Sequence, residues 1–145
     1  MTDLNLQVLK YTAHYCAALV DNYLVDSINI AERTLKLRPN SKSTQERLNY
    51  LKLGICKLSF YFETGRKYHK VIQFNHIGDC TTHAFIDKMT GDLYKPASHK
   101  APQKLPNFNL CDVKQREWLF NNASYDGKYW SYTFNSLPPH THLND

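Results

Sequence analysis

The sequence lacks the short patterns by which many catalytic and cofactor-binding proteins are identified. Glycine accounts for only 5 of the 145 residues, and no glycine-rich loop that would cradle a phosphate group is present. The sequence also lacks the G-x-S-x-G pattern of serine hydrolases, the H-E-x-x-H pattern of zinc peptidases and the C-x-x-C pair of metal and redox sites. We therefore expect no catalytic residues, no metal and no cofactor, and the sequence predicts a protein that is not an enzyme.

Targeting signals are absent as well. The N-terminus has no basic stretch followed by an apolar run and a small-residue cleavage site. No apolar run approaches the roughly 18 residues of a membrane span. These absences predict an intracellular protein without a membrane partner. The cysteines are widely spaced, and in a reducing compartment we expect free thiols at Cys16, Cys56, Cys80 and Cys111.

Length and composition predict a single domain over residues 1–145. A chain of 145 residues buries about two-thirds of its unfolded surface, so it needs no disulfide or metal to fold. The hydrophobic content of 42% and the aromatic content of 13% are too high for a disordered chain. We expect a helical part over 1–54, a sheet over 55–96, a strap with a helix and a hairpin over 97–136, and a polar tail over 137–145.

The N-terminal part has the periodicity of helices. From Asp3 to about residue 37, apolar residues recur three and four positions apart, and Asp3 is placed to cap the start. A break near Asp26 would divide this segment into two helices. After the turn-forming stretch "LRPNSKS", Ser43 and Glu46 have the spacing of a capping box for a helix that ends near Gly54.

From Cys56 the pattern changes to the two-residue alternation of β-strands. "CKLSFYF" and "KYHKVIQF" predict one hairpin, and "THAFID" and "DLYKP" predict another around the turn "KMTG". In that turn Asp87 supplies a side-chain acceptor, Gly91 permits positive φ, and Asp92 begins the next strand. A ligand contact through Asp87 or Asp92 is the alternative. The proline of "DLYKP" ends the sheet because it has no N–H to donate.

The proline-containing segment over residues 97–110 predicts no regular element. Each proline restricts the residue before it to extended backbone, and loops of this length are often functional. Two interpretations stay open. The segment is either an ordered strap across the sheet, held by Leu105 and Phe108, or a binding loop that presents its histidine and two lysines.

The C-terminal part completes the predicted fold. Asp112 is placed to cap a helix, and Asp126-Gly127 between aromatic runs predicts a two-residue hairpin turn. The fold class is therefore α+β. N-terminal helices pack on an antiparallel four-stranded meander, which is followed by a proline-rich strap, a C-terminal helix and a short aromatic hairpin.

Positive charge is concentrated in the middle of the chain. The net charge is +5, and residues 57–104 contain eight basic and four acidic residues. Aromatic residues lie among these cations, as in single-strand binding proteins, where bases stack on rings and cations meet phosphates. The alternative is that the same rings form the core between sheet and helices. The candidate binding residues are Arg66, Lys67, Tyr68, Lys70, Lys95, His99, Lys100 and Lys104.

About half of the chain resembles a known group of proteins. "GRKYHKVIQF", "HAFIDKMTGDLYKPASHKAP", "NFNL" and "YDGKYW" are similar to segments of small uncharacterised proteins of tailed bacteriophages, and those of marine cyanobacterial phages are closest. That group carries the block HAF(V/I)DKxTGD(V/L)YKPAS. His99 departs from it, because the group has an aromatic residue after "PAS". The resemblance implies a phage origin and supplies no catalytic residue.

Two functional hypotheses follow. The first is a non-enzymatic phage accessory protein that binds a host protein or nucleic acid in the cytoplasm of the infected cell. The second is a minor virion component, such as a decoration or tail-associated protein, which the tyrosine-rich, proline-containing C-terminal half indicates. An enzyme with a site around His83, Asp87 and His99 is a weaker third. The sequence leaves the partner and the oligomeric state open.

Overall fold

A single long helix forms the centre of the fold, in a computed structural model that describes residues 2–131. Helix α1 (Asp3–Leu37) runs for 35 residues without the break that the sequence allows near Asp26. Its N-cap is Thr2, whose hydroxyl oxygen accepts the N–H of Asn5 at 3.1 Å. The predicted cap at Asp3 is therefore wrong by one residue. Asp3 lies in the first turn instead, where a negative charge suits the helix dipole.

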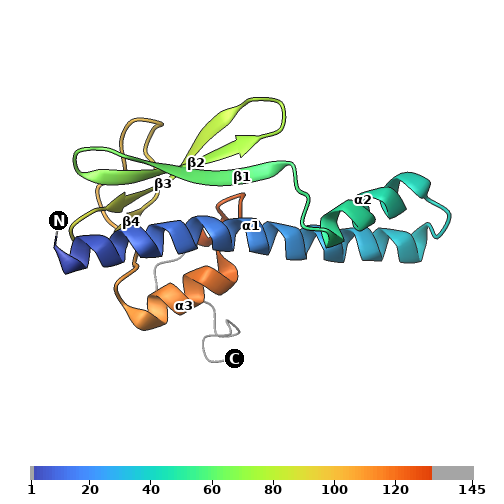
Figure 1. The fold of residues 1–145 in the computed structure, drawn as a ribbon, viewed down its shortest axis with the longest axis horizontal. Coiled ribbons are helices and arrows are strands. Elements are labelled where there is room, and N and C mark those ends of the chain that lie inside the picture. Colours follow the sequence, from blue (N-terminus) through green and yellow to red (C-terminus); the bar gives the residue numbers. More distant parts are fainter. Residues whose placement is uncertain (1, 132–145) are drawn as a thin grey trace.

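Helix α2 (Lys42–Lys52) folds back along the C-terminal half of α1 (Figure 1). Its N-cap is Ser41, whose side chain accepts the N–H of Thr44 at 3.3 Å, so the capping box predicted at Ser43 is not formed. A small apolar cluster of Ala31, Leu48 and Leu51 joins the two helices. We call α2 and the half of α1 beneath it the helical arm.

The sheet is an antiparallel meander of five strands, one more than the sequence predicts. The strands are neighbours in chain order: β1 (Leu58–Thr64), β2 (Tyr68–Asn75), β3 (Cys80–Asp87), β4 (Asp92–Tyr94) and β5 (Phe108–Asn109). The additional strand, β5, comes from the segment that we interpreted as a strap or a loop. Phe108 lies opposite Leu93 of β4.

Residues between β4 and β5 form the irregular end of a hairpin. Pro96 bridges Pro102, and the N–H of Gln103 donates to the carbonyl of Lys95 at 2.8 Å. The hydroxyl of Thr82 on β3 donates to the carbonyl of His99 at 3.2 Å, so the tip of this hairpin is tied to β3. Leu105 is 78% exposed and holds nothing in place, contrary to the prediction, whereas Phe108 is buried.

The two faces of the sheet have different partners. The inner face packs on α1 and contributes the apolar side chains Phe60, Val71, Ala84, Ile86, Leu93 and Phe108 to the main core. The register between β2 and β3 shifts at Val71 and Ile72, which leaves His83 without an opposite residue. The outer face carries Tyr68, Lys70, Phe85 and Tyr94. Phe85 lies opposite Lys70 on one side and opposite Tyr94 on the other. The outer face therefore holds the candidate binding residues of the strands.

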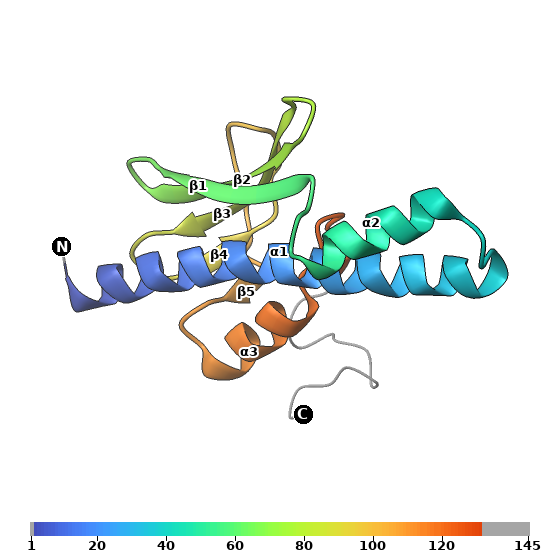
Figure 2. The same ribbon diagram turned by 45° about the vertical axis from the view of Figure 1, so that its right-hand side comes forward.

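The C-terminal helix α3 (Val113–Asn122) is capped by Asp112, as the sequence predicts, and the carboxylate accepts the N–H of Gln115 at 3.0 Å. Figures 1 and 2 show α1 between the sheet and α3. Phe108 of β5 stacks on Trp118 of α3, with ring centroids 5.5 Å apart. The main core therefore includes residues from both ends of the described chain.

The predicted aromatic hairpin is wrong over the residues that the structure describes. Asp126-Gly127 does turn, with φ of +74° at Gly127, but a short 3₁₀ helix, η1 (Lys128–Ser131), follows it instead of a strand. The reason is that the ring of Tyr129 turns back into the core and is 3% exposed. The rest of the predicted hairpin and the predicted tail lie outside the described residues.

None of the helices in residues 2–131 has both the length and the apolar character of a transmembrane helix.

Candidate binding surface

The turn between β1 and β2 is held firmly and presents two basic residues. The N–H of Gly65 donates to the carbonyl of Tyr68 at 2.8 Å and closes the turn. The ammonium of Lys88 donates to the carbonyls of Gly65 and Arg66, at 2.9 and 3.3 Å. Because these bonds fix the backbone, the exposed side chains of Arg66 and Lys67 project from a defined position.

A hollow of about 260 Å³ opens beside this turn on the outer face of the sheet. We call it the basic hollow. Strands β1 and β2 and the turn between them supply most of its lining, β3 supplies one aromatic ring, and the β4–β5 hairpin supplies one lysine. The lining residues are Glu63, Thr64, Gly65, Arg66, Lys67, Tyr68, Lys70, Phe85 and Lys100.

Aromatic rings form one wall of the basic hollow. The ring of Tyr68 meets the edges of Phe85 and Tyr94, with centroids 5.7 and 5.8 Å away. The ammonium of Lys67 lies 5.4 Å from the centroid of the Tyr68 ring, within the range of a cation–π contact. Burial, followed by the charge of Asp92, raises the pKa of the Tyr94 phenol, so it stays neutral. This wall therefore offers flat, uncharged surface beside cations.

The charge of the basic hollow is strongly one-sided. Arg66, Lys67, Lys70 and Lys100 face a single carboxylate, that of Glu63. Glu63 and Lys70 are cross-strand partners, and Phe85 lies opposite Lys70 on the other side. A concave surface with excess charge of one sign attracts ligands of the other sign. The hollow is suited to phosphate or carboxylate groups.

The structure brings five of the eight candidate binding residues together and separates the other three. Arg66, Lys67, Tyr68, Lys70 and Lys100 share the basic hollow. A separate recess of about 540 Å³, on the irregular end of the β4–β5 hairpin, includes Lys95 and Lys104 in its lining. His99 lines neither recess; it is exposed at the hairpin tip.

The predicted turn residues make hydrogen bonds that hold the β3–β4 turn and the neighbouring strand β5. The carboxylate of Asp87 accepts the N–H groups of Met89 and Thr90, at 2.8 and 3.1 Å. Gly91 has φ of +80° and donates its N–H to the carbonyl of Asp87 at 2.9 Å. Asp92 accepts the side-chain N–H of Asn109 at 2.9 Å, which joins β4 to β5.

A buried polar network was not predicted from the sequence. The hydroxyl of Tyr129 in η1 is bonded to the hydroxyl of Tyr15 on α1 and to Nε2 of His83 on β3. Burial lowers the pKa of His83 to about 4, against the opposing charge of Asp126, and burial raises the pKa of both phenols. All three groups are therefore neutral at pH 7. Their separations of 46 and 114 residues leave no local sequence signal.

The side chains of the suggested enzyme site do not meet. The ring of His83 lies in the core against Tyr129, the carboxylate of Asp87 caps its turn, and His99 is exposed at the hairpin tip. Within residues 2–131, no three histidine, cysteine, aspartate or glutamate side chains form a group that could hold a metal ion. All four cysteines are free. His140 and His142 lie outside the described residues.

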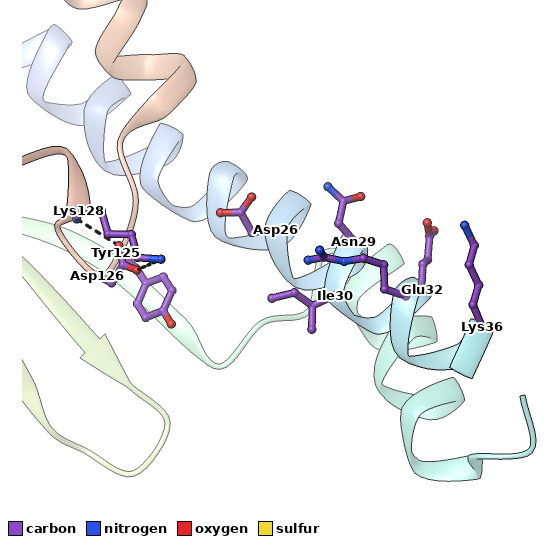
Figure 3. Close-up of a pocket in the computed structure, with 9 residues that line it drawn as sticks. Asp26, Asn29, Ile30, Glu32, Lys36, Tyr125, Asp126 and Lys128 are labelled. Carbon is purple, nitrogen blue, oxygen red and sulfur yellow. Dashed lines mark hydrogen bonds and ion pairs between the residues drawn. The ribbon is translucent and has the colours of Figure 1, made fainter. Parts of the chain in front are cut away.

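Another recess, of about 590 Å³, lies between the arm part of α1 and the loop before η1 (Figure 3). Three acids and three bases line it in equal number: Asp26, Glu32, Asp126, Arg33, Lys36 and Lys128. In Figure 3, Asn29, Glu32 and Lys36 extend side by side away from Tyr125 instead of converging. Because the charges balance and the side chains diverge, this recess favours no class of ligand.

Comparison with known proteins gives a family without a known activity. Residues 1–132 match the protein family described as "Family of unknown function (DUF7717)". No curated protein and no solved structure matches the chain. The chemistry of the surface is therefore the basis for a function.

Proposed function

The chain belongs to this family of unknown function, and we propose that it is a non-enzymatic binding protein whose basic hollow holds single-stranded nucleic acid. One observation carries the proposal: four cations and an aromatic wall surround one hollow on the outer face of the sheet. Single-strand binding proteins combine these two elements, since cations meet the phosphates and rings stack on unpaired bases.

Exposed rings continue from the basic hollow along the outer face. Tyr61 on β1 and Phe74 on β2 are 41% and 38% exposed, although both lie in a sheet. Their positions alternate with the inward-facing core residues, so they share the face of Tyr68 and Lys70. In this proposal, one nucleotide binds at the hollow and its neighbours stack on Tyr61 and Phe74. Paired bases offer no free ring faces, which favours a single strand over a duplex.

Fluorescence anisotropy with a labelled oligothymidine tests the proposal. Each phosphate contact to a single strand adds about 0.7 to the slope of log affinity against log salt concentration. The double variant Lys70→Gln/Lys100→Gln should lower affinity and reduce that slope by about 1.4. Tyr68→Leu should lower affinity by roughly 5- to 150-fold, the range of one lost base stack, without changing the slope.

The matched control is Lys42→Gln/Lys52→Gln, which removes two charges from α2, and α2 contributes no residue to the lining of the basic hollow. It should leave both affinity and slope close to those of the unmodified protein. Affinity that stays flat between low and moderate salt contradicts the proposal. Equal losses in the two double variants contradict it too, because they would indicate net charge in place of a site.

The cellular setting that we propose rests on the sequence resemblance to phage proteins. There the protein acts in the cytoplasm of an infected bacterium, on nucleic acid or on a host protein. A tagged copy recovered from infected lysate, with and without nuclease, tests this setting. Loss of the co-purifying material after nuclease supports nucleic acid, and a host protein that survives nuclease supports the protein partner. Recovery of phage structural proteins supports a minor virion component instead.

A further inference from the structure

Strand β1 is one edge of the sheet in the part of the chain that the structure describes. It pairs with β2 along its whole length and with no strand on its other side. The bond from the N–H of Gly65 to Tyr68 fixes the alternation along the pair. Ser59, Tyr61 and Glu63 therefore bond to β2, and the backbone N–H and C=O groups of Leu58, Phe60, Phe62 and Thr64 point toward the free edge.

This edge lacks the features that usually keep sheet edges from pairing. Proteins protect such edges with proline, bulges, lysine or very short strands. Strand β1 has seven residues, LSFYFET, with no proline and with Glu63 as its one charged residue. Its register with β2 is unbroken. The edge is therefore a ready template for a further strand.

An apolar groove runs beside the free edge. It has a volume of about 400 Å³ and is lined by Ala13, Cys16, Ala17, Val20, Phe60, Tyr61 and Phe62. Ala13 and Ala17 are exposed, although they lie in the middle of the helix that supports the sheet. Leu6, which is 51% exposed, continues the same stripe at helical spacing. Small residues allow a second helix to approach α1 closely at this point.

We propose that β1 pairs antiparallel with β1 of a second copy of this chain, around a two-fold axis at Phe60, and so joins two five-stranded sheets into one. Phe60 then lies opposite its own counterpart, and Leu58 lies opposite Phe62. All of these residues have backbone groups that point toward the free edge, so the hydrogen bonds between the two strands can form. The two α1 stripes meet beneath the joined strands.

Charge complementarity identifies a second copy as the occupant. Lys57 and Glu63 lie three residues before and three residues after Phe60, and both are exposed. Lys57 lies in the bend directly before β1, and pairing that extends by this one residue places Lys57 opposite Glu63 of the second copy, twice around the axis. An opposite-charge pair directly across two strands stabilises their pairing, and a like-charge pair destabilises it. A strand of an unrelated protein would not have this symmetry.

The inference does not depend on nucleic-acid binding. The axis is perpendicular to the sheet, so both basic hollows lie on the same outer face. Glu63 lines the basic hollow, so Glu63→Lys changes the nucleic-acid site as well as the edge, whereas Lys57 lies outside that lining. Loss of pairing after Lys57→Glu, read from molecular mass, is therefore a separate result from loss of nucleic-acid binding, read from anisotropy.

Light scattering after size exclusion, in the absence of nucleic acid, measures the pairing. A single chain has a mass of 16.9 kDa, and we expect about 34 kDa for the unmodified protein. Glu63→Lys places two lysines opposite each other and should shift the mass toward that of one chain. Lys57→Glu should do the same with two glutamates. The double variant Lys57→Glu/Glu63→Lys restores opposite charges and should restore the larger mass.

Two further variants complete the experiment. Ala17→Glu adds a charge to the stripe on α1 and should also give single chains, with a circular-dichroism spectrum that confirms the fold. Glu117→Lys makes the same charge change as Glu63→Lys, at an exposed position of α3, and should leave the mass unchanged. A mass of 16.9 kDa for the unmodified protein at every concentration overturns the proposal. The proposal is also overturned if the protein stays at that mass but its edge pairs with a strand of another protein. A larger mass that resists all of these variants overturns it as well.

Discussion

The imidazole of His83 lies among aromatic rings in the core of the protein. The ring of Phe60 meets it edge-on at 5.3 Å, and the rings of Tyr129 and Trp130 lie 5.8 and 6.0 Å away. Its Nε2 is hydrogen-bonded to the hydroxyl of Tyr129. A neutral imidazole fits this environment, whereas an imidazolium loses its hydration there, and the charge of Asp126 offsets only part of that loss.

The first prediction is that His83 makes the protein less stable in acid. Its pKa is about 6.5 in the unfolded chain and about 4 in the folded protein, so the unfolded state binds the proton more tightly. The stabilisation is complete above pH 6.5 and is lost as the pH falls from 6.5 to 4. It amounts to about 3 kcal/mol. Urea unfolding at a series of pH values measures it.

A variant without a titrating group separates this effect from general acid denaturation. His83→Gln should be less stable than the unmodified protein at pH 7 and should lose less stability between pH 6.5 and 4. His69 contributes in the same direction in both proteins, because burial and then the charge of Lys88 lower its pKa. His76→Gln, at an exposed position, is the control. Parallel pH profiles for His83→Gln and the control contradict the prediction.

The second prediction concerns Gly91 in the turn between β3 and β4. A side chain there would have to adopt a φ of +80°, and its Cβ would lie 2.7 Å from the sulfur of Cys111. Gly78 also has positive φ, of +95°, but a Cβ added there meets nothing within 4 Å. Gly78→Ala should therefore cost the backbone strain alone, about 1 kcal/mol, and Gly91→Ala at least about 2 kcal/mol. Thermal unfolding of the two variants measures the difference, and equal costs would exclude a contribution from the Cys111 contact.

At the scale of elements, local patterns predict the elements well and their long-range partners poorly. The cap at Asp112 and the turn at Asp87 and Gly91 are visible in the sequence, because all of their hydrogen bonds span a few residues. Strand β5 is not, because two residues shortly after a proline become a strand only where β4 lies beside them. Tyr129 breaks the predicted hairpin for the same reason: its partners are Tyr15 and His83.

The candidate site also has a part that local sequence predicts and a part that depends on long-range pairing. The cluster of cations in the β1–β2 turn is contiguous in the sequence, so Arg66, Lys67, Tyr68 and Lys70 can be selected directly. Phe85 and Glu63 complete the basic hollow through strand register, which the sequence does not show. Charge alone groups Lys95 and Lys104 with these residues in the sequence, whereas the hairpin places them in another recess.

The third prediction is that the helical arm unfolds independently of the main body. Its cluster has three buried side chains, Ala31, Leu48 and Leu51, with Leu24, Ile28 and Leu35 partly buried against them, whereas the main core includes the sheet, α1 and α3. Local opening is easiest where few apolar side chains are buried. Amide hydrogens of α2 should therefore exchange faster than those of β2 and β3, as measured by mass spectrometry.

Leu51→Ala provides the sharper form of this test. Removing a buried leucine side chain typically costs about 2–5 kcal/mol, and Leu51 is one of the three buried side chains of this cluster. Exchange should therefore rise in α2 and in the adjoining part of α1, and stay unchanged in β2 and β3. Acceleration of equal size throughout the protein would indicate a single cooperative unit and contradict the prediction.

At the scale of the whole molecule, α1 connects two cores of unequal size. Its N-terminal half supports the sheet and α3, and its C-terminal half supports α2 (Figures 1 and 2). Near the start of that second half, Asn22 donates to the carbonyl of Ala123 and the ring of Tyr23 meets that of Tyr125. At 1.5 Å per residue, its 35 residues extend over about 52 Å. The free edge of β1 and the basic hollow both belong to the larger of these two bodies. Opening of the arm should therefore leave both surfaces intact.

The hydrogen bond between Tyr15 and Tyr129 also has a consequence for how the protein folds during its synthesis on the ribosome. The two tyrosines are 114 residues apart, and ribosomes add roughly 5–20 residues per second. About 10 s therefore pass between the synthesis of α1 and the synthesis of the last residues that cover its apolar side. The arm needs only residues up to Leu51 and can form earlier. During that interval the nascent chain exposes an amphipathic helix, which makes it a natural client for chaperones that bind emerging polypeptides.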